Sequence, residues 1–184
     1  MLVLVSKNKD SPRIYIIDTS AILSGKPLPV DQQDFWTVEE VAEEFSPGGS
    51  SYRMFQYLRE KGLSLHRPSK NAKRKVNQII QKLGENLRLS SADRAVLSLA
   101  VDVDLMENVH AVILTDDYSI QNIASVLKIE FQPISQKGIT KTLKWIRRCQ
   151  GCKRVLSSDE SVCPICGSNA QFVVDKKEGK NQDK

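Results

Sequence analysis

The sequence predicts an α/β fold, with a parallel sheet flanked by helices, followed by a small C-terminal zinc ribbon built on four cysteines. Two short apolar runs, RIYII at 13–17 and AVILT at 111–115, lack the polar alternation of a half-exposed strand. Such runs are typical of strands buried on both faces of a parallel sheet. Amphipathic helical segments alternate with them, as in α/β proteins. All four cysteines lie between residues 149 and 166, which separates a metal-binding segment from the α/β part.

Length and composition suit one ordinary core with an appendage. The chain has 184 residues, 40% hydrophobic and 27% charged. We expect an α/β domain at 12–135, a basic linker at 136–148, the ribbon at 149–174 and a disordered tail at 175–184. The apolar opening MLVLV is too short for a signal sequence, and no apolar run is as long as a membrane span. We therefore expect a cytoplasmic protein without membrane contact.

The elements follow in order from local patterns. A strand over 13–17 ends at Asp18, and a short turn of helix follows it. Thr37 and Glu40 have the spacing of a capping box, which predicts a helix through VEEVAEEF. Helical periodicity then predicts helices at 52–61 and 69–83, the second basic and closed by Gly84. A short strand is expected at 63–66 between them.

The second half repeats the alternation. Small and apolar residues at helical spacing predict a helix that begins at Ser90 or Ser91. The strand at 111–115 ends in two acids, and a helix with inward Ile120 and Ile123 follows. A last short strand is expected at 129–132, before Pro133.

Several acids are expected at one edge of the sheet. Asp18, Asp116 and Asp117 follow the two buried strands, and the carboxyl ends of parallel strands share an edge where ligands bind. Asp93, in a first helical turn, and Glu44, beside a buried helix face, are further candidates. Each also has a purely structural interpretation. Asp93 has capping-box spacing from Ser90, and Asp116 or Asp117 can simply cap the next helix.

Clustered carboxylates repel one another and persist where a cation neutralises them. Oxygen ligands suit Mg²⁺ or Mn²⁺, which bind phosphate oxygens and activate water. The chain has no GxxxxGK[ST] loop and no HExxH motif. A hydrolytic phosphodiesterase therefore fits better than an NTPase or a metalloprotease.

The cysteines form two CxxC pairs, Cys149 with Cys152 and Cys163 with Cys166. This spacing predicts a closed, structural zinc site, and a redox role is the weaker alternative. Lys153 and Gly167 directly follow the pairs, as in the turns of zinc knuckles.

The segment around the first cysteine pair is strongly basic. From 137 to 154 there are seven Lys or Arg and no acid, which favours a nucleic-acid partner over a merely solvated face. The expected RNA-binding residues are Lys137, Lys141, Lys144, Arg147, Arg148, Lys153 and Arg154.

Four segments, IIDTSAIL, TVEEVAEEF, SSADRAVLSLA and ILTDDYSIQNIA, resemble in order the motifs of PIN-domain ribonucleases. With the basic linker, RRCQGC and CPICG, the chain resembles PIN-domain endoribonucleases of the Nob-one type, and its compactness looks archaeal. The resemblance implies Mg²⁺ or Mn²⁺ dependence and a cut at the 3′ end of small-subunit precursor rRNA. It also implies the small ribosomal subunit, and assembly factors, as partners.

The family pattern implies metal ligands at Asp18, Glu44 and Asp93. Asp117 is favoured over Asp116 as the fourth acid, because the pattern places it two residues after the threonine, here Thr115. Ser20 and Thr115 are expected to orient the acids. Two alternatives stay open at this point: a toxin-type PIN ribonuclease that cuts tRNA or mRNA, and a non-catalytic RNA-binding ribosome assembly factor.

Overall fold

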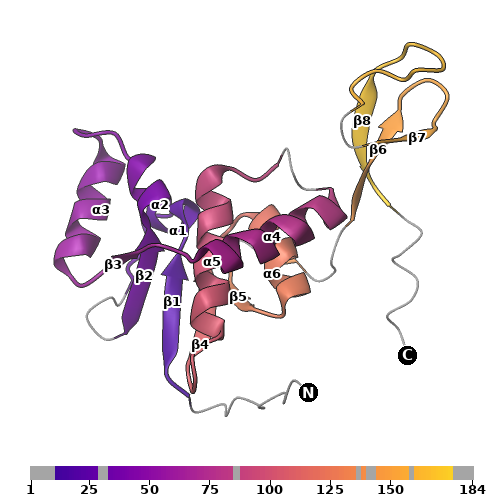
Figure 1. Cartoon of the computed structure of the whole chain (residues 1–184). Helices are drawn as coiled ribbons and strands as arrows, with labels where there is room; N and C mark the ends of the chain where they lie inside the picture. Colours follow the sequence, from indigo (N-terminus) through magenta and orange to yellow (C-terminus); the bar gives the residue numbers. More distant parts are fainter. Residues whose placement is uncertain are drawn as a thin grey trace.

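The main sheet is parallel and has five strands. A computed structural model describes residues 11–28, 33–84, 88–135, 138–139, 144–157 and 160–175. The strand order is β3-β2-β1-β4-β5, with parallel pairing between each pair of neighbours (Figure 1). The predicted fold class is therefore confirmed. The strands are β1 (Arg13–Ile17), β2 (Asp34–Val38), β3 (Ser64–His66), β4 (His110–Leu114) and β5 (Glu130–Gln132).

Helices connect these strands and cover the sheet. The bounds are α1 (Thr19–Leu23), α2 (Glu39–Glu43), α3 (Ser50–Glu60), α4 (Lys70–Leu83), α5 (Ser91–Asp104) and α6 (Tyr118–Leu127). Within the described residues, no helix is long and apolar enough to cross a membrane.

Helix α5 is the centre of the packing. It contacts β1, β2 and β4 as well as α2, α4 and α6. Val96, Leu97, Ala100 and Val103 are fully buried on it, and its small alanines allow the close approach of neighbouring elements. Ser90 begins the helix as predicted. Its hydroxyl accepts the Asp93 amide at 3.1 Å, and the Asp93 carboxylate accepts the Ser90 amide at 2.6 Å.

The prediction that Thr37 caps helix α2 is wrong. Thr37 lies in β2, a strand that the local sequence pattern did not predict, and α2 begins after Val38 without a side-chain cap. The buried Thr37 hydroxyl instead donates to the Ile17 carbonyl of β1 at 2.7 Å. A threonine is favoured in a strand because of its branched side chain, so its spacing from Glu40 was coincidental.

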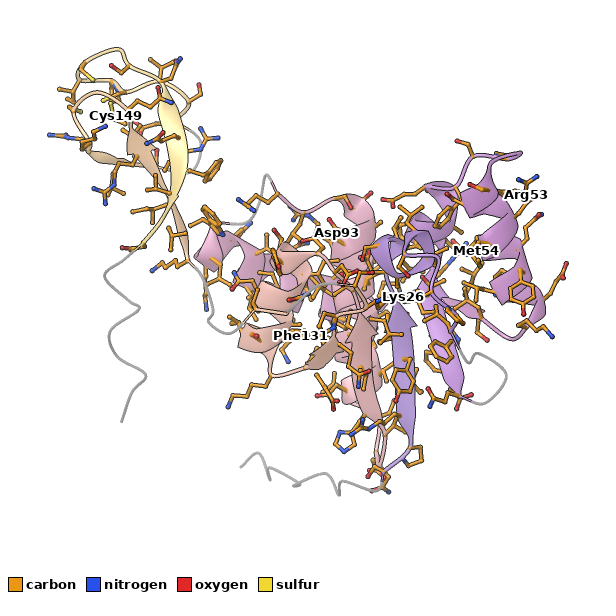
Figure 2. The ribbon with its side chains drawn as sticks, turned by 180° about the vertical axis from the view of Figure 1, so that it is seen from behind. Lys26, Arg53, Met54, Asp93, Phe131 and Cys149 are labelled. Carbon is orange, nitrogen blue, oxygen red and sulfur yellow. The ribbon has the colours of Figure 1, made fainter. Side chains whose placement is uncertain are left out.

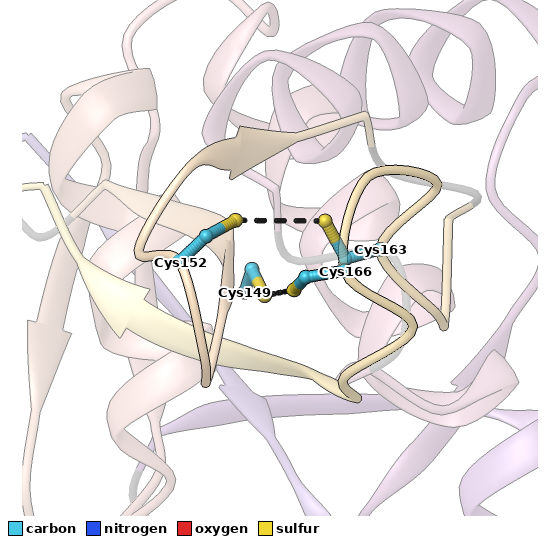
Figure 3. Close-up of side chains that lie close together, drawn as sticks. All are labelled: Cys149, Cys152, Cys163 and Cys166. Atoms are coloured by element: carbon cyan, nitrogen blue, oxygen red, sulfur yellow. Dashed lines mark hydrogen bonds between the residues drawn. The ribbon is translucent and has the colours of Figure 1, made fainter.

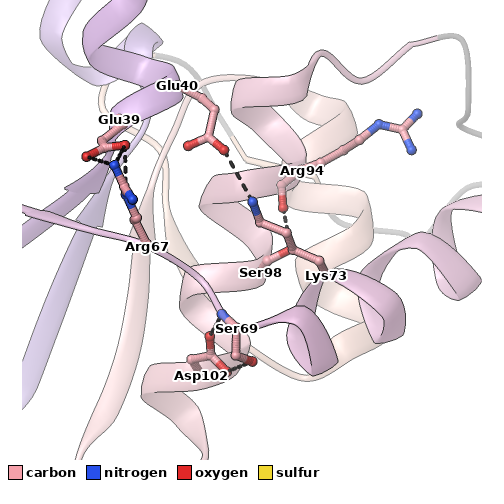
Figure 4. A network of polar contacts seen from close by, with 8 residues as sticks. All are labelled: Glu39, Glu40, Arg67, Ser69, Lys73, Arg94, Ser98 and Asp102. Atoms are coloured by element: carbon pink, nitrogen blue, oxygen red, sulfur yellow. Dashed lines mark hydrogen bonds and ion pairs between the residues drawn. The ribbon is translucent and has the colours of Figure 1, made fainter.

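Polar contacts join α2, α4 and α5 on the surface (Figure 4). Arg67, just before α4, binds both carboxylate oxygens of Glu39, and Lys73 pairs with Glu40 at 3.4 Å. The Ser69 amide and hydroxyl, at the start of α4, both donate to Asp102 of α5. Part of the charge on basic helix α4 therefore serves to hold the helices together.

A second, antiparallel sheet forms the C-terminal part. Its order is β7-β6-β8, with β6 (Trp145–Cys149), β7 (Val155–Leu156) and β8 (Ala170–Val174). The last four residues assigned to the linker, 145–148, thus belong to a strand. The remainder of the linker, apart from 138–139 and 144, and the tail from 176 to 184 lie outside the described residues. The proposed domain boundaries stay a prediction.

Replacing Thr37 with Val tests the strand assignment. The substitution keeps the buried shape and removes the bond to the Ile17 carbonyl. We expect the free energy of unfolding in urea to fall by about 1 kcal/mol, a typical value for one such bond. Thr37→Ser, which keeps the hydroxyl, should retain the bond and lose only a methyl group. An unchanged stability of the valine variant would contradict the role of the hydroxyl.

Candidate active site and zinc site

Asp18 lies at the carboxyl end of the central strand, β1. Its backbone amide donates to the Leu114 carbonyl of the adjacent strand β4, and its residue exposure is only 3%. The aspartate thus sits where two neighbouring parallel strands end, at the edge where α/β sheets bind ligands. A carboxylate so well buried requires specific compensation for its lost hydration.

Two hydroxyl groups provide part of this compensation. The Ser20 hydroxyl donates to Asp18 Oδ2 at 2.7 Å, and the Thr115 hydroxyl donates to the same oxygen at 2.8 Å. The same hydroxyls accept the backbone amides of Asp116 and Asp117, each at 3.0 Å. The two groups that were expected to orient the acids therefore link the ends of β1 and β4 through Asp18.

Burial raises the pKa of Asp18, and the hydrogen bonds from Ser20 and Thr115 oppose this effect only in part. A raised pKa means that the folded chain disfavours the ionised carboxylate. A bound cation would favour the ionised form and so oppose this effect of burial.

Asp93 lies close enough to Asp18 and Asp117 to interact with their charges. Burial is the main cause that raises the pKa of Asp93, bonds from Ser90 oppose it, and the charges of Asp18 and Asp117 raise it further. Figure 2 shows Asp93 far from Cys149 of the second sheet. The capping role of Asp93 and its place beside the other acids are both present, so one interpretation does not exclude the other.

The two acids after β4 have different contacts. Asp116 Oδ1 accepts the amides of Ile134 and Ser135, at 2.8 and 2.9 Å, and so holds the turn after β5. Asp117 caps α6, with Oδ1 accepting the Ser119 amide at 2.6 Å. Of the two, Asp117 is the acid whose charge acts on Asp93.

Glu44 reaches the site from helix α2. It is exposed at the end of that helix, and its carboxylate accepts a hydrogen bond from the Thr19 hydroxyl. Thr19 directly follows Asp18 and was not among the expected site residues. Its position in the DTS sequence after a buried strand was the available signal.

The carboxylates of Asp18 and Asp117 lie close enough to Asp93 for their charges to interact, but among the described residues these acids do not form a compact ligand group. Among the described residues, only the four cysteines form a group with all ligand atoms within 4.8 Å. Like charges repel in a partly buried edge, and the oxygen donors suit a hard divalent cation such as those that PIN nucleases use. The donor set therefore fits such a cation.

The four cysteine sulfurs form the compact group (Figure 3). Cys149 Sγ lies 3.3 Å from Cys166 Sγ, and Cys152 Sγ lies 3.7 Å from Cys163 Sγ. These distances exclude disulfides, whose sulfurs lie about 2.05 Å apart. Four sulfurs bound to one zinc ion at about 2.3 Å lie about 3.8 Å from one another. The group can therefore bind zinc.

The turns around the cysteines match the prediction of two knuckles. Lys153 and Gly167, which follow the two pairs, both adopt left-handed backbone conformations, with φ of 62° and 69°. Hydrogen bonds from the Ser168 hydroxyl and amide hold the pKa of the Cys166 thiol at about 5. The Arg154 amide lowers the pKa of Cys152, but the thiols of Cys149 and Cys163 outweigh it and raise the pKa to about 11. Zinc is bound by thiolates. Because the raised pKa of Cys152 opposes its ionisation, a bound cation would stabilise the four thiolates together.

The expected RNA-binding residues are in different environments. Lys153 and Arg154 are exposed, while Lys144 and Arg148 are half-buried. Arg147 packs over the Phe172 ring at 4.8 Å and donates to the Glu160 carbonyl at 2.8 Å, so its guanidinium is used inside the ribbon. Lys137 and Lys141 lie outside the described residues.

Comparison with known proteins places this sheet, with acids at its carboxyl edge, in the class of PIN-domain ribonucleases. Residues 15–103 match the family model described as the PIN domain of ribonuclease. This segment includes Asp18, Glu44 and Asp93.

Relatives extend the similarity beyond that domain. Endoribonuclease Nob1 of Archaeoglobus fulgidus is 34% identical over 85% of this chain and 89% of its own. Endoribonuclease Nob1 of Methanothermobacter thermautotrophicus is 35% identical over 83% and 88%. Ribonuclease VapC1 of Thermoplasma acidophilum is 37% identical over 89% and 80%. The chain belongs to the PIN-domain endoribonucleases, and its resemblance to the Nob-one type is confirmed.

The pKa of Asp18 predicts how charge affects stability. Because the folded-state pKa is raised above 3.8, the contribution of Asp18 to stability is full below that value and is lost as the pH rises through the folded-state value. Asp18→Asn removes the charge, and its amide oxygen can accept both hydroxyl bonds. In the zinc-loaded protein, without added Mg²⁺ or Mn²⁺, we expect this variant to melt above the wild type at about pH 7, with a smaller difference at about pH 4. A lower melting temperature at about pH 7 would contradict this account.

Proposed function

We propose that the chain is a metal-dependent endoribonuclease that makes the 3′-end maturation cut of small-subunit precursor rRNA in the cytoplasm. The observation that carries the proposal is the buried, hydrogen-bonded Asp18 beside the charges of Asp93 and Asp117. Asp18 also caps helix α1, with its side chain accepting the Ser20 amide, but a cap does not need a carboxylate this deeply buried at a ligand-binding edge. A divalent cation held there would offset the cost of the buried charge.

In this proposal Asp18, Glu44, Asp93 and Asp117 hold Mg²⁺ or Mn²⁺. When bound, the cation supplies activation of water and stabilisation of charge at the phosphate. Ser20 and Thr115 bind Oδ2 of Asp18, which directs Oδ1 toward a ligand role. Thr19 holds Glu44 beside the strand end. Asp116 instead holds the turn at 134–135, which supports the preference for Asp117.

The substrate assignment rests on the relatives named Nob1, which are 29–35% identical over 83–86% of the chain. These alignments extend beyond Cys149, as does that of VapC1, so their length alone does not separate the two substrates. A small zinc-bound sheet with exposed Lys153 and Arg154 adds a second surface for an RNA strand. Precursor rRNA and the small ribosomal subunit are therefore the proposed partners.

The toxin-type alternative has a specific observation in its favour, since VapC1 of Thermoplasma acidophilum is as similar as the Nob1 proteins. A toxin would cut free tRNA or mRNA and be inhibited by a partner encoded beside it. The two functions differ in substrate, so the same purified protein can be offered a precursor rRNA fragment, tRNA and mRNA. Cleavage of tRNA or mRNA in preference to the rRNA fragment would favour the toxin.

Asp18→Asn tests the catalytic proposal. We expect cleavage of an RNA that spans the 3′ end of small-subunit rRNA to fall by roughly 100-fold or more, because several kcal/mol of metal-dependent stabilisation is lost. RNA affinity measured by fluorescence anisotropy should change little.

Asp34→Asn is the matched control, since Asp34 is exposed at the opposite, amino end of the adjacent strand. It should cleave as the wild type does. Wild-type RNA binding without cleavage in either Mg²⁺ or Mn²⁺ would favour the non-catalytic assembly factor. Equal loss of binding and cleavage in Asp18→Asn would contradict the assignment of its role.

The proposed zinc is structural and has its own test. We expect one zinc ion per chain by elemental mass spectrometry, and loss of it in Cys163→Ser. Hydrogen exchange in β6, β7 and β8 should then rise, because binding energy for such zinc sites is folding energy. Exchange in the five-stranded sheet should stay slow. The chain has four cysteines in all, so zinc retained by this variant would contradict the four-thiolate site.

A further inference from the structure

The first strand of the ribbon begins directly against the end of helix α4. Gly84 ends that helix in a left-handed conformation, with φ of 72°. A Cβ atom added at Gly84 would lie 2.2 Å from the carbonyl oxygen of Trp145 and 3.2 Å from its carbonyl carbon. Both the conformation and the space therefore require glycine. Figure 1 shows this meeting point, where β6 comes down beside the end of α4.

Arg88 forms a second link at the same place. Its guanidinium carbon lies 4.1 Å from the centroid of the Trp145 ring, within the range of a cation–π interaction. Its Nε also donates to the Ser119 hydroxyl at 3.3 Å. The Ser119 amide is the one that Asp117 caps. Arg88 thus joins Trp145 to the first turn of α6, whose N-cap residue Asp117 is a proposed metal ligand.

Strand β6 extends this contact to the zinc site. Trp145 is its first residue and Cys149 its last, and it is the central strand of its sheet. A five-residue strand spans about 14 Å between its ends. Beside the Trp145 end of β6, the Asp175 amide donates a hydrogen bond to the Lys144 carbonyl at 2.8 Å. Because the strand is paired on both sides, fixing Trp145 restrains the whole ribbon.

We propose that Gly84, Arg88 and Trp145, here called the stem contact, hold the ribbon at a fixed place relative to the acids and thereby select the bond that is cut. These are positioning residues, and the selection of the bond rests on the proposed endoribonuclease function. A ribbon that binds RNA while held in a fixed position brings one phosphodiester to the acids. A ribbon on a flexible linker raises the local concentration of RNA but brings several phosphodiesters to the acids.

The first test measures the stem contact without RNA. NMR relaxation of backbone amides in the zinc-loaded full chain gives a rotational correlation time for each sheet. We expect one shared value in the wild type. Gly84→Ala should shorten the value of the ribbon alone, because the added Cβ excludes the Trp145 carbonyl.

Gly25→Ala is the matched control for Gly84→Ala. Gly25 has a similar φ of 66°, but a Cβ there meets no atom within 4 Å. It carries the same backbone strain without the clash, and the shared correlation time should persist. Trp145→Ala gives a second route to the free ribbon in case Gly84→Ala folds poorly. Separate correlation times in the wild type would overturn the proposal, whatever the activity.

The second test maps the cut on a long precursor RNA. Wild type should give one product end, whereas Trp145→Ala and Arg88→Ala should give several neighbouring ends, with a higher KM and a smaller change in kcat. Trp145→Phe keeps an aromatic face for Arg88 and should restore the single end. A single unchanged end in the alanine variants would overturn the selection role. Absence of any cleavage would instead count against the proposed function, while the shared correlation time would still support the stem contact.

Discussion

The buried carboxylate of Asp18 is the constraint on which the rest of the site depends. It lies under the ends of β1 and β4, where water cannot hydrate it fully, and its hydroxyl partners compensate only in part. Ser20 and Thr115 bind it and at the same time hold the backbone that carries Asp116 and Asp117. The same bonds therefore fix the acid and position its neighbours. The electrostatic cost that remains is what a divalent cation would offset, which connects the local stability of the sheet edge to the proposed chemistry.

The remaining acids differ in how far their contacts stabilise the fold and how far they serve the proposed metal site. Asp93 closes a capping box at the start of the most central helix, and its pKa responds to the charges of Asp18 and Asp117. Asp116 is committed to the backbone after β5. Glu44 arrives from α2 through Thr19, so its position depends on a single surface bond. Of these acids, Asp18 and Asp117 are close enough to Asp93 for their charges to act on it, whereas Glu44 is exposed and bonded to Thr19.

Much of this arrangement was predictable from local sequence. Residues 13–17 and 110–114 form strands close to the predicted bounds, and Ser90 and Gly84 cap their helices as predicted, because a cap acts within a few residues. The hydroxyls of Ser20 and Thr115 bond to Asp18 at the strand ends, and their role in orienting the acids stays a prediction. Strand β2 was missed, since Thr37 and Glu40 imitate a capping box while the hydroxyl bonds across the sheet. The use of Arg147 inside the ribbon and the approach of Trp145 to Gly84 depend on contacts between distant segments. No local pattern encodes such contacts.

The most direct test of the central claim is where a divalent cation binds. Crystals of the wild-type protein soaked in Mn²⁺ can be measured at a wavelength at which manganese scatters anomalously. We expect a peak bonded to Asp18 and to at least one of Asp93 and Asp117, at about 2.1 Å, close to the distance for oxygen ligands of Mg²⁺. We also expect no peak in Asp18→Asn crystals. A manganese peak away from Asp18, or one that persists in the variant, would contradict the claim that this buried carboxylate organises the site.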